Sequence, residues 1–417
     1  RCHEADIKAI VAVGDTNILR NVIRARTYCP SLEHCISIGP VVPQNWENYW
    51  QGAMMAPKFK SQKGQNHVTD VFLMYFTSGT SGEPKMVMHD HSYPLAHIMT
   101  AKYWHNVDDT SLHLTVADTG WGKAVWGKLY GQWFSGANVF VYHYERFKPS
   151  DVLEMIQKYK ITSFCAPPTV FRYMIRENVR NYDISSLKYC TIAGEALNPS
   201  VFEEWKELTG IKLMEGFGQT ELTLAIANLM GSTHKLGSMG KPVPLYDIDI
   251  LDPDGNSVPI GETGEIVVRT DKNIPCGLFA GYYNDDKKTE EVWYDGCYHT
   301  GDTAWRDEDG FFWYVGRVDD VIKSSGYRIG PFEIESVIME LPYVLECGVS
   351  AAPDEVRGQV VKASIVLVKG TEPTEELKKD IQNYVKKHTA PYKYPRIVEF
   401  KTELPKTISG KIQRNKL

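Results

Sequence analysis

Short apolar segments alternate with amphipathic stretches from Asp6 to about Asp320, which is the pattern of a layered α/β protein. The apolar segments predict strands, and the stretches between them predict helices: strands at 71–76, 137–142, 161–166 and 188–194, helices at 149–159 and 198–209. After Leu236 the pattern becomes one of strands joined by turn sequences at 252–256 and 307–310, which predicts a β-rich subdomain with a hairpin at each turn.

The last hundred residues show a different order of elements, which predicts a small separate α+β unit. We expect strands and helices in the following ranges: strands at 321–324, 346–351, 360–368 and 397–401, helices at 331–339 and 375–387. The second helix has acidic residues early, basic residues late and one stripe that contains Leu377, Ile381, Tyr384 and His388. The expected fold is therefore a large layered α/β domain with a β-rich subdomain over 1–318, followed by an α+β domain over 319–417. The short junction at Asp319 predicts a hinge rather than a flexible tether.

The composition is that of an ordinary globular protein. The 417 residues are 43% hydrophobic and 24% charged, which excludes a mainly disordered chain. The net charge is −6 and the basic residues are scattered, so we expect no nucleic-acid partner. No apolar run approaches the roughly 18 residues of a membrane span. The eight cysteines include no CxxC pair and no secretory signal opens the chain, so we expect reduced thiols in a cytoplasmic enzyme.

The segment with the most specific composition follows the strand at 71–76. It reads Thr77-Ser78-Gly79-Thr80-Ser81-Gly82-Glu83-Pro84-Lys85. Glycines allow backbone N–H groups to turn toward one anion, and hydroxyl groups add further donors, so the segment is typical of a phosphate-binding loop. Its spacing does not fit a Walker A loop, and a flexible surface loop is the alternative.

This loop resembles the glycine-rich signature of the adenylate-forming superfamily, which comprises acyl-CoA synthetases, firefly luciferases and peptide-synthetase adenylation domains. Within it, the chain looks most similar to medium-chain acyl-CoA synthetases. Further segments are similar to the family's other motifs and occur in the same order: Gly194–Leu197, Glu215–Glu221, Tyr298–Asp302, Gly316–Asp320, Ser324–Gly330 and Pro405–Lys411. The resemblance covers essentially the whole chain, although the family has a longer N-terminal portion.

The resemblance implies an ATP site made of these motifs. Beyond the loop at 77–82 and Lys85, it assigns to ATP the residues Gly194, Glu195, Ala196, Glu215, Gly216, Phe217, Gly218, Gln219, Thr220, Asp302 and Arg317. The segment Gly194–Leu197 is similar to the family's loop that borders adenine, and Phe217 in the next segment offers a flat face for the purine. Asp302 can accept bonds from ribose hydroxyls, and Arg317 can face the ribose or phosphates.

By the same resemblance, Thr220 contacts the α-phosphate and Glu221 binds Mg²⁺, a cation that takes one or two carboxylates plus phosphate oxygens. Each of these residues also has a plain alternative. Phe217 could be packing, Asp302 a turn cap, Thr220-Glu221 a helix start and Arg317 a surface cation.

Lys411 is the expected catalytic residue of the first step, together with Thr220 and Glu221. A carboxylic acid is already ionised at pH 7, so no general base is needed. The obstacle is repulsion between the substrate carboxylate and the ATP α-phosphate, which one cation lowers. For the second step the resemblance implies that a mobile lid turns about Asp319 and brings Ser325, Gly326 and Arg328 to CoA.

The expected acyl pocket combines Trp121, Lys123 and Trp126 with Cys165 and Gly218. The two tryptophans would form apolar walls, although such a segment is also common in a core, and Lys123 has no explanation in such a wall. Acetate-specific members have Trp at the position of Gly218. The glycine predicts free space there and an acid larger than acetate: medium-chain, branched or aryl.

The sequence thus predicts an AMP-forming acid–CoA ligase that uses a small carboxylic acid, ATP, Mg²⁺ and coenzyme A. Three alternatives differ in class: an adenylation enzyme that loads a carrier protein, a luciferase-type oxidative enzyme and a nucleotide-binding relative without catalytic activity.

Overall fold

The computed structural model describes residues 1–417 except 61–63, 65, 79–83, 145, 196 and 407–411. By its internal contacts the chain forms two compact units. The first comprises Arg1–His91 and Ala280–Asp286, and the second comprises Ser92–Phe279 and Lys287–Leu417. The domain boundary expected at residue 318 stays a prediction. Across the described residues, no helix has the length and apolar character needed to cross a bilayer.

The first unit contains two small sheets. Parallel strands β1 (Ala9–Val13), β2 (His34–Ile38) and β3 (Glu47–Asn48) accompany helices α1 (Thr16–Arg26) and α2 (Tyr49–Met55). The second sheet is antiparallel and has the order β15 (Gly281–Tyr282), β5 (Pro84–Asp90) and β4 (Val71–Ser78). Strand β4 thus confirms the strand predicted at 71–76 and extends it.

A seven-stranded sheet forms the centre of the second unit. Its order is β12 (Lys241–Pro242), β11 (Ile226–Ala227), β10 (Leu213–Phe217), β9 (Tyr189–Ile192), β8 (Ser163–Ala166), β6 (Leu112–Thr115) and β7 (Asn138–Phe140). The five strands from β10 to β7 are parallel, and β11 and β12 are antiparallel. All four residues of β8 are buried, as expected of a parallel strand covered on both faces.

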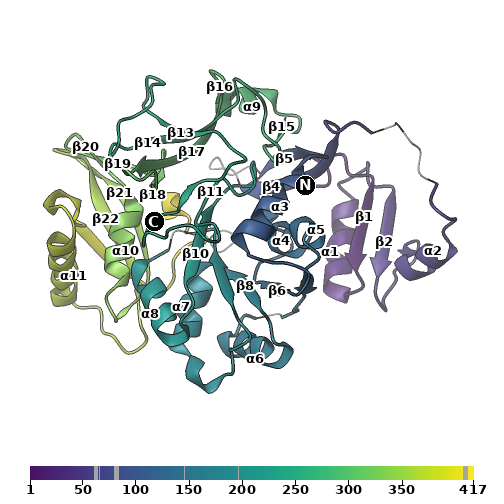
Figure 1. Ribbon diagram of the computed structural model, residues 1–417, viewed down its shortest axis with the longest axis horizontal. Coiled ribbons are helices and arrows are strands. Elements are labelled where there is room, and N and C mark those ends of the chain that lie inside the picture. The colour runs from purple at the N-terminus through teal and green to yellow at the C-terminus, as the bar shows by residue number, and fades with distance from the viewer. Residues whose placement is uncertain (61–63, 65, 79–83, 145, 196, 407–411) are drawn as a thin grey trace. The chain divides into compact units, whose positions relative to one another are not determined.

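Helices cover both faces of this sheet. On one face lie α6 (Pro149–Tyr159), α7 (Pro168–Arg176) and α8 (Pro199–Thr209), whose core includes Leu153, Phe164, Phe171 and Trp205 (Figure 1). The helices α3 (Tyr93–Ile98), α4 (Gly122–Lys128) and α5 (Tyr130–Phe134) and the π-helix η1 (Met99–Trp104) lie on the other face, and a 3₁₀ turn, η2 (Val179–Asn181), follows α7. Proline at the first position of α6, α7 and α8 fits the helical start. It explains why the sequence predicts the start of α6 correctly and that of α8 within one residue, whereas α7 was not predicted.

The β-rich subdomain is a five-stranded antiparallel sheet: β13 (Ile248–Leu251), β14 (Gly264–Arg269), β17 (Cys297–Arg306) and β16 (Trp293–Tyr294), with β18 (Phe312–Arg317) paired to β17. Helix α9 (Asp286–Val292) precedes β16. Both predicted turns join neighbouring antiparallel strands, so the prediction of two hairpins is confirmed.

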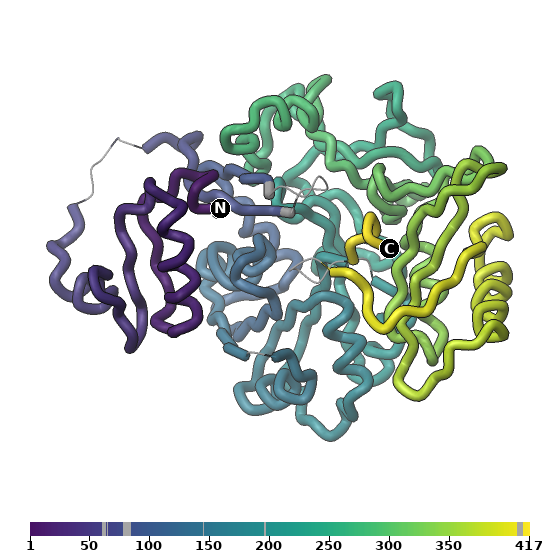
Figure 2. The backbone as a smooth tube through the Cα atoms, turned by 180° about the vertical axis from the view of Figure 1, so that it is seen from behind, coloured from purple at the N-terminus to yellow at the C-terminus, as the bar shows by residue number. Residues whose placement is uncertain are grey.

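The C-terminal part confirms the predicted α+β order. Its sheet contains β20 (Tyr327–Ile329), β19 (Ile322–Ser324), β22 (Gly358–Leu367), β21 (Val344–Asp354) and β23 (Ile397–Lys401). Helices α10 (Pro331–Met339) and α11 (Glu375–His388) share one core with this sheet, through residues such as Ile334, Ile338, Ile381 and Val385. Two 3₁₀ turns follow, η3 (Pro391–Lys393) and η4 (Arg414–Lys416), and η4 packs against β21 (Figure 2). Strand β20 was not predicted, because three residues give too short a pattern.

Candidate active site

The two loops expected to border adenine lie side by side, because they follow the adjacent parallel strands β9 and β10. The first contains Gly194 and Glu195. Glu195 Oε2 accepts a 2.7 Å hydrogen bond from the hydroxyl of Thr169 in α7. Gly194 has a φ of +98°, which residues with a side chain rarely adopt. Ala196 lies outside the described residues. The second loop begins at Phe217, whose ring is half-buried.

Glu215 and Gly216 hold these loops from inside the protein. Glu215 is 5% exposed, and its Oε1 accepts a hydrogen bond of 3.3 Å from the Leu197 backbone N–H. Burial raises the pKa of Glu215 to about 8, so its carboxyl group is protonated at neutral pH. At Gly216 a Cβ atom would lie 2.6 Å from the Trp104 ring, so only glycine fits. The contacts of these two residues therefore set the position of the loops.

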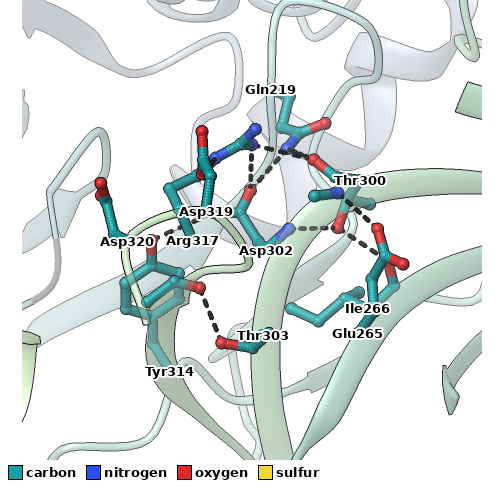
Figure 3. Close-up of polar contacts among 12 residues, drawn as sticks. Gln219, Glu265, Ile266, Thr300, Asp302, Thr303, Tyr314, Arg317, Asp319 and Asp320 are labelled. Atoms are coloured by element: carbon teal, nitrogen blue, oxygen red, sulfur yellow. Dashed lines mark hydrogen bonds and ion pairs between the residues drawn. The ribbon is translucent and has the colours of Figure 1, made fainter. Parts of the chain in front are cut away.

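Asp302 is the centre of a polar array in β17 (Figure 3). The residue is 6% exposed, and its carboxylate accepts hydrogen bonds from Gln219 Nε2 at 2.5 Å and from the Tyr314 hydroxyl at 3.0 Å. Gln219 also donates to the Thr300 carbonyl at 2.8 Å and accepts a bond from the Tyr298 hydroxyl at 2.7 Å. Both polar ends of the Gln219 side chain are thus held in place.

Arg317 completes the array because it stands directly opposite Asp302 in the β17–β18 pairing. Its Nη1 lies 3.6 Å from Asp302 Oδ2 and donates to the Thr300 carbonyl at 3.0 Å, while its Nε lies 3.4 Å from Asp319 Oδ1. Burial by itself would lower the pKa of Arg317, but Asp302 and Asp319 raise it above its ordinary value. The guanidinium of Arg317 also lies close to Gly301, where a Cβ atom would be 2.7 Å from it. This close contact explains why glycine occupies position 301. Arg317 thus connects the expected ribose carboxylate with the expected hinge.

Thr220 and Glu221 lie in a bend, separated from β10 by two residues, and not at the start of a helix. Both are half-buried, and the Glu221 carbonyl accepts a 2.7 Å bond from Phe279 N. Within the part of the chain that the structure describes, no group of three or more His, Cys, Asp or Glu side chains could hold a metal ion. A single carboxylate such as Glu221 still suits Mg²⁺, which takes its other ligands from phosphate and water.

The expected acyl pocket is partly filled by the protein itself. A Cβ atom on Gly218 would lie 2.3 Å from the Trp126 ring and 2.5 Å from the Thr223 carbonyl, so the space expected at Gly218 is occupied by Trp126. The expectation of free space there was wrong, because the ring of Trp126 in α4 lies against Gly218. Trp126 and Cys165 are buried, and Trp121 precedes α4 as its N-cap.

Lys123 gains an explanation that the sequence did not offer. Its ammonium group donates to the Ala193 carbonyl at 2.5 Å, next to Gly194. Lys123 therefore ties α4 to the loop expected to border adenine.

The glycine-rich loop belongs to the first unit. Thr77 and Lys85 are paired on β4 and β5, and the Lys85 ammonium lies 5.0 Å from the centre of the Tyr282 ring. Gly79, Thr80, Ser81 and Gly82 lie outside the described residues, and Ser78 is described only as part of β4.

In the C-terminal part, Lys411 also lies outside the described residues, between the paired residues Lys406 and Ile412. Ser325 and Gly326 form the turn between β19 and β20 with φ values of 49° and +84°, as in a two-residue hairpin turn. A Cβ atom at Gly326 would meet nothing within 4 Å, and Arg328 is exposed on β20.

Sequence reasoning missed Tyr314 and Arg414. Burial and the neighbouring Asp302 raise the pKa of the Tyr314 hydroxyl well above its ordinary value, so it is a constant donor. Arg414 makes two hydrogen bonds to Glu335, at 3.1 and 2.8 Å, and one to Asp320, at 3.0 Å. Only the strand register and the return of the chain end bring these residues to the site, so no local pattern could have found them.

Comparison with known proteins identifies the family. The model of the AMP-binding enzyme family matches residues 1–283, and that of the AMP-binding enzyme C-terminal domain matches residues 333–411. The mouse protein named acyl-coenzyme A synthetase ACSM3, mitochondrial, is 41% identical over 98% of this chain and 71% of its own length. The Pongo abelii protein of the same name is 46% identical over 84% of this chain, which spans 60% of that relative.

The fold agrees with solved structures. The structure of the anthranilate CoA ligase AuaEII in complex with anthranoyl-AMP matches with a TM-score of 0.89 and 31% identity. The match covers 100% of this chain and 78% of that one, which confirms the predicted fold class. One expectation is contradicted. We expected a cytoplasmic enzyme, but these relatives are named as mitochondrial proteins. The chain belongs to the AMP-binding enzyme family, and the resemblance of its motifs to the adenylate-forming superfamily is thereby confirmed.

Proposed function

We propose that this protein is an AMP-forming acid–CoA ligase that acts through an acyl-adenylate. The observation that carries the proposal is the array of Asp302, Gln219, Tyr314 and Arg317, in which a buried carboxylate is held next to a cation at 3.6 Å. Such a carboxylate can accept hydrogen bonds from the two hydroxyls of a ribose. The names of the relatives, acyl-coenzyme A synthetases and a CoA ligase, support the same reaction.

In the first step, a carboxylate oxygen of the acid attacks the ATP α-phosphorus and pyrophosphate leaves. Lys411 would stabilise the charge that develops between the two anions, and Thr220 would donate to the α-phosphate. Glu221 would hold Mg²⁺, which would neutralise charge at the phosphates. In the second step, the CoA thiol gives up its proton, its sulfur attacks the acyl carbon and AMP leaves. Ser325, Gly326 and Arg328 would meet CoA in this step.

We propose a medium-chain, branched or aryl acid as the substrate. The indole of Trp126, which packs on Gly218, gives the pocket an apolar wall, and each buried methylene contributes about 0.8 kcal/mol to binding. An acid with several carbon atoms therefore gains more from this wall than acetate does. The names of the relatives support a mitochondrial location.

Loading of a carrier protein is the second candidate, since it shares the first step. It is less well supported, because the relatives reported above are named for CoA as the acyl acceptor. A non-catalytic relative would bind ATP without releasing pyrophosphate.

One experiment tests these functions together. Pyrophosphate and AMP release are measured with ATP and Mg²⁺ across acetate, straight-chain, branched and aryl acids, with and without CoA. We expect acid-dependent pyrophosphate release, and AMP turnover that needs CoA. Acetate as the best acid would overturn the proposed substrate class. Turnover with a carrier protein but not with CoA would favour the second candidate, and binding of ATP without pyrophosphate release from any acid would favour a non-catalytic protein.

A further inference from the structure

One side chain, Asn198, joins the ends of two helices that are far apart in the sequence. It is the N-cap of α8, where its Oδ1 accepts hydrogen bonds from the backbone N–H and the hydroxyl of Ser200, both at 2.8 Å. Its Nδ2 donates to the backbone carbonyl of Ser336 in α10 at 2.9 Å. The carboxamide thus offers its acceptor to the start of one helix and its donor to the end of another.

The Ser336 carbonyl needs this donor. Ser336 is among the last four residues of α10, whose carbonyls have no partner within an α-helix. Four residues further on, the Glu340 N–H donates instead to Val337 and Ile338. The partial negative charge at the C-terminal end of α10 therefore faces the amide group of Asn198.

This contact lies where the C-terminal part meets the expected adenine loop. Asn198 directly follows Leu197, the last residue of that loop. Met339, three residues after Ser336 and therefore on the same face of α10, has its Sδ 3.9 Å from Arg172 Nη1 in α7. One face of α10 is thus held by both α7 and α8.

The C-terminal end of the chain indicates the orientation of the C-terminal part in which Asn198 contacts α10. Arg414, three residues beyond Lys411, binds Asp320 and is an electrostatic neighbour of Tyr314, whose hydroxyl bonds to Asp302. The segment after Lys411 therefore lies beside the expected ribose array while α10 is docked on Asn198.

We infer that Asn198 is a positioning residue that favours the orientation of the C-terminal part used for adenylate formation. It does so by capping α10, and the inference rests on the function proposed above. Asn198 has no role in the thioester step, in which the C-terminal part is turned away.

The test replaces Asn198 by a nearly isosteric residue. Asn198→Asp keeps the cap of α8, because a carboxylate accepts from Ser200 and is favoured at a helix N-terminus. It removes the donor to α10 and sets a negative charge against the Ser336 carbonyl. We expect single-turnover acyl-adenylate formation to fall about tenfold, with thioester formation from supplied acyl-adenylate and CoA unchanged.

Two further variants separate this role from a structural one. Asn48 is the N-cap of α2 and accepts from Gln51 N at 3.0 Å, so Asn48→Asp is a matched control that should leave both half-reactions unchanged. Asn198→Ser keeps a helix cap and adds no charge, so it should give a smaller loss in the first half-reaction only. Equal losses in both half-reactions, or no loss in either, would overturn the inference.

Hydrogen exchange gives a readout that does not depend on turnover. Asn198→Asp should speed exchange in a peptide covering 331–344 but not in one covering 199–210. Unchanged exchange in the first peptide would overturn the inference even if no acid were turned over. A wild-type protein that forms no acyl-adenylate would contradict the proposed function instead.

Discussion

Asp302 is the residue at which the expected nucleotide site is most sharply defined. Its two oxygens are shared among an amide from the loop after β10 and a phenol and a guanidinium that both come from β18. A carboxylate retains further lone pairs after these contacts, so it can still accept bonds from a ribose.

Asp302→Asn should raise the KM for ATP about 10- to 100-fold, because the amide nitrogen places donors opposite either Gln219 or Tyr314 and the lost charge leaves Arg317 with less counter-charge. The KM is measured by pyrophosphate release. Asp309→Asn is the matched control, since Asp309 is 68% exposed and pairs with Lys235. A normal KM in Asp302→Asn would show that the ribose binds elsewhere.

At Trp126 and Gly218, the size of one side chain is expected to set the length of the acid. Trp126→Phe removes part of the ring that fills the space over Gly218. Acids one or two methylenes longer should gain in relative kcat/KM, by about fourfold per methylene accommodated. A panel of straight-chain acids measures this shift. Trp133→Phe, at a position that is 62% exposed, should keep the original ranking, and the same ranking in Trp126→Phe would remove Trp126 from the pocket.

At the scale of elements, β18 and the residues after it connect the site with the C-terminal part. Arg317 ends β18 and holds Asp319, whereas Arg414 holds Asp320 and Glu335. Two neighbouring carboxylates are therefore bound by two different arginines, and we expect the C-terminal part to rotate about the backbone between them.

Asp319→Pro should slow one half-reaction far more than the other, because proline fixes φ near −65° and restricts Val318 as well. Both half-reactions are measured separately. Asp319→Ala is the control, since it removes the bond to Arg317 without restricting the backbone. Equal rates in Asp319→Pro and Asp319→Ala would place the hinge elsewhere.

At the scale of the whole molecule, Glu215 makes stability depend on pH. Burial raises its pKa from 4.5 to about 8, so between these values the folded protein holds a proton that the unfolded chain has lost. The contribution of Glu215 to the free energy of unfolding is therefore fully present below pH 4.5 and falls as the pH rises toward 8.

Glu215→Gln should remove this pH dependence while keeping an acceptor for Leu197. The difference in unfolding free energy between the two proteins should change by on the order of 3 kcal/mol between pH 5 and pH 8, in favour of the variant at high pH. Denaturant unfolding at several pH values measures it. Glu262→Gln, at an exposed turn, is the control, and a parallel pH profile for wild type and Glu215→Gln would contradict the assigned pKa.

The sequence by itself determined the family motifs, the order of the elements in the C-terminal part and the ends of several helices. Helices 149–159 and 331–339 were predicted with the bounds they have, because proline at a helix start acts within a few residues. The tertiary structure alone decided that Tyr314 reaches Asp302, that Trp126 fills the space at Gly218, that Lys123 binds Ala193 and that Glu215 is protonated. These features depend on strand register, on burial and on contacts between distant segments, and none of these is expressed in the residues near each position.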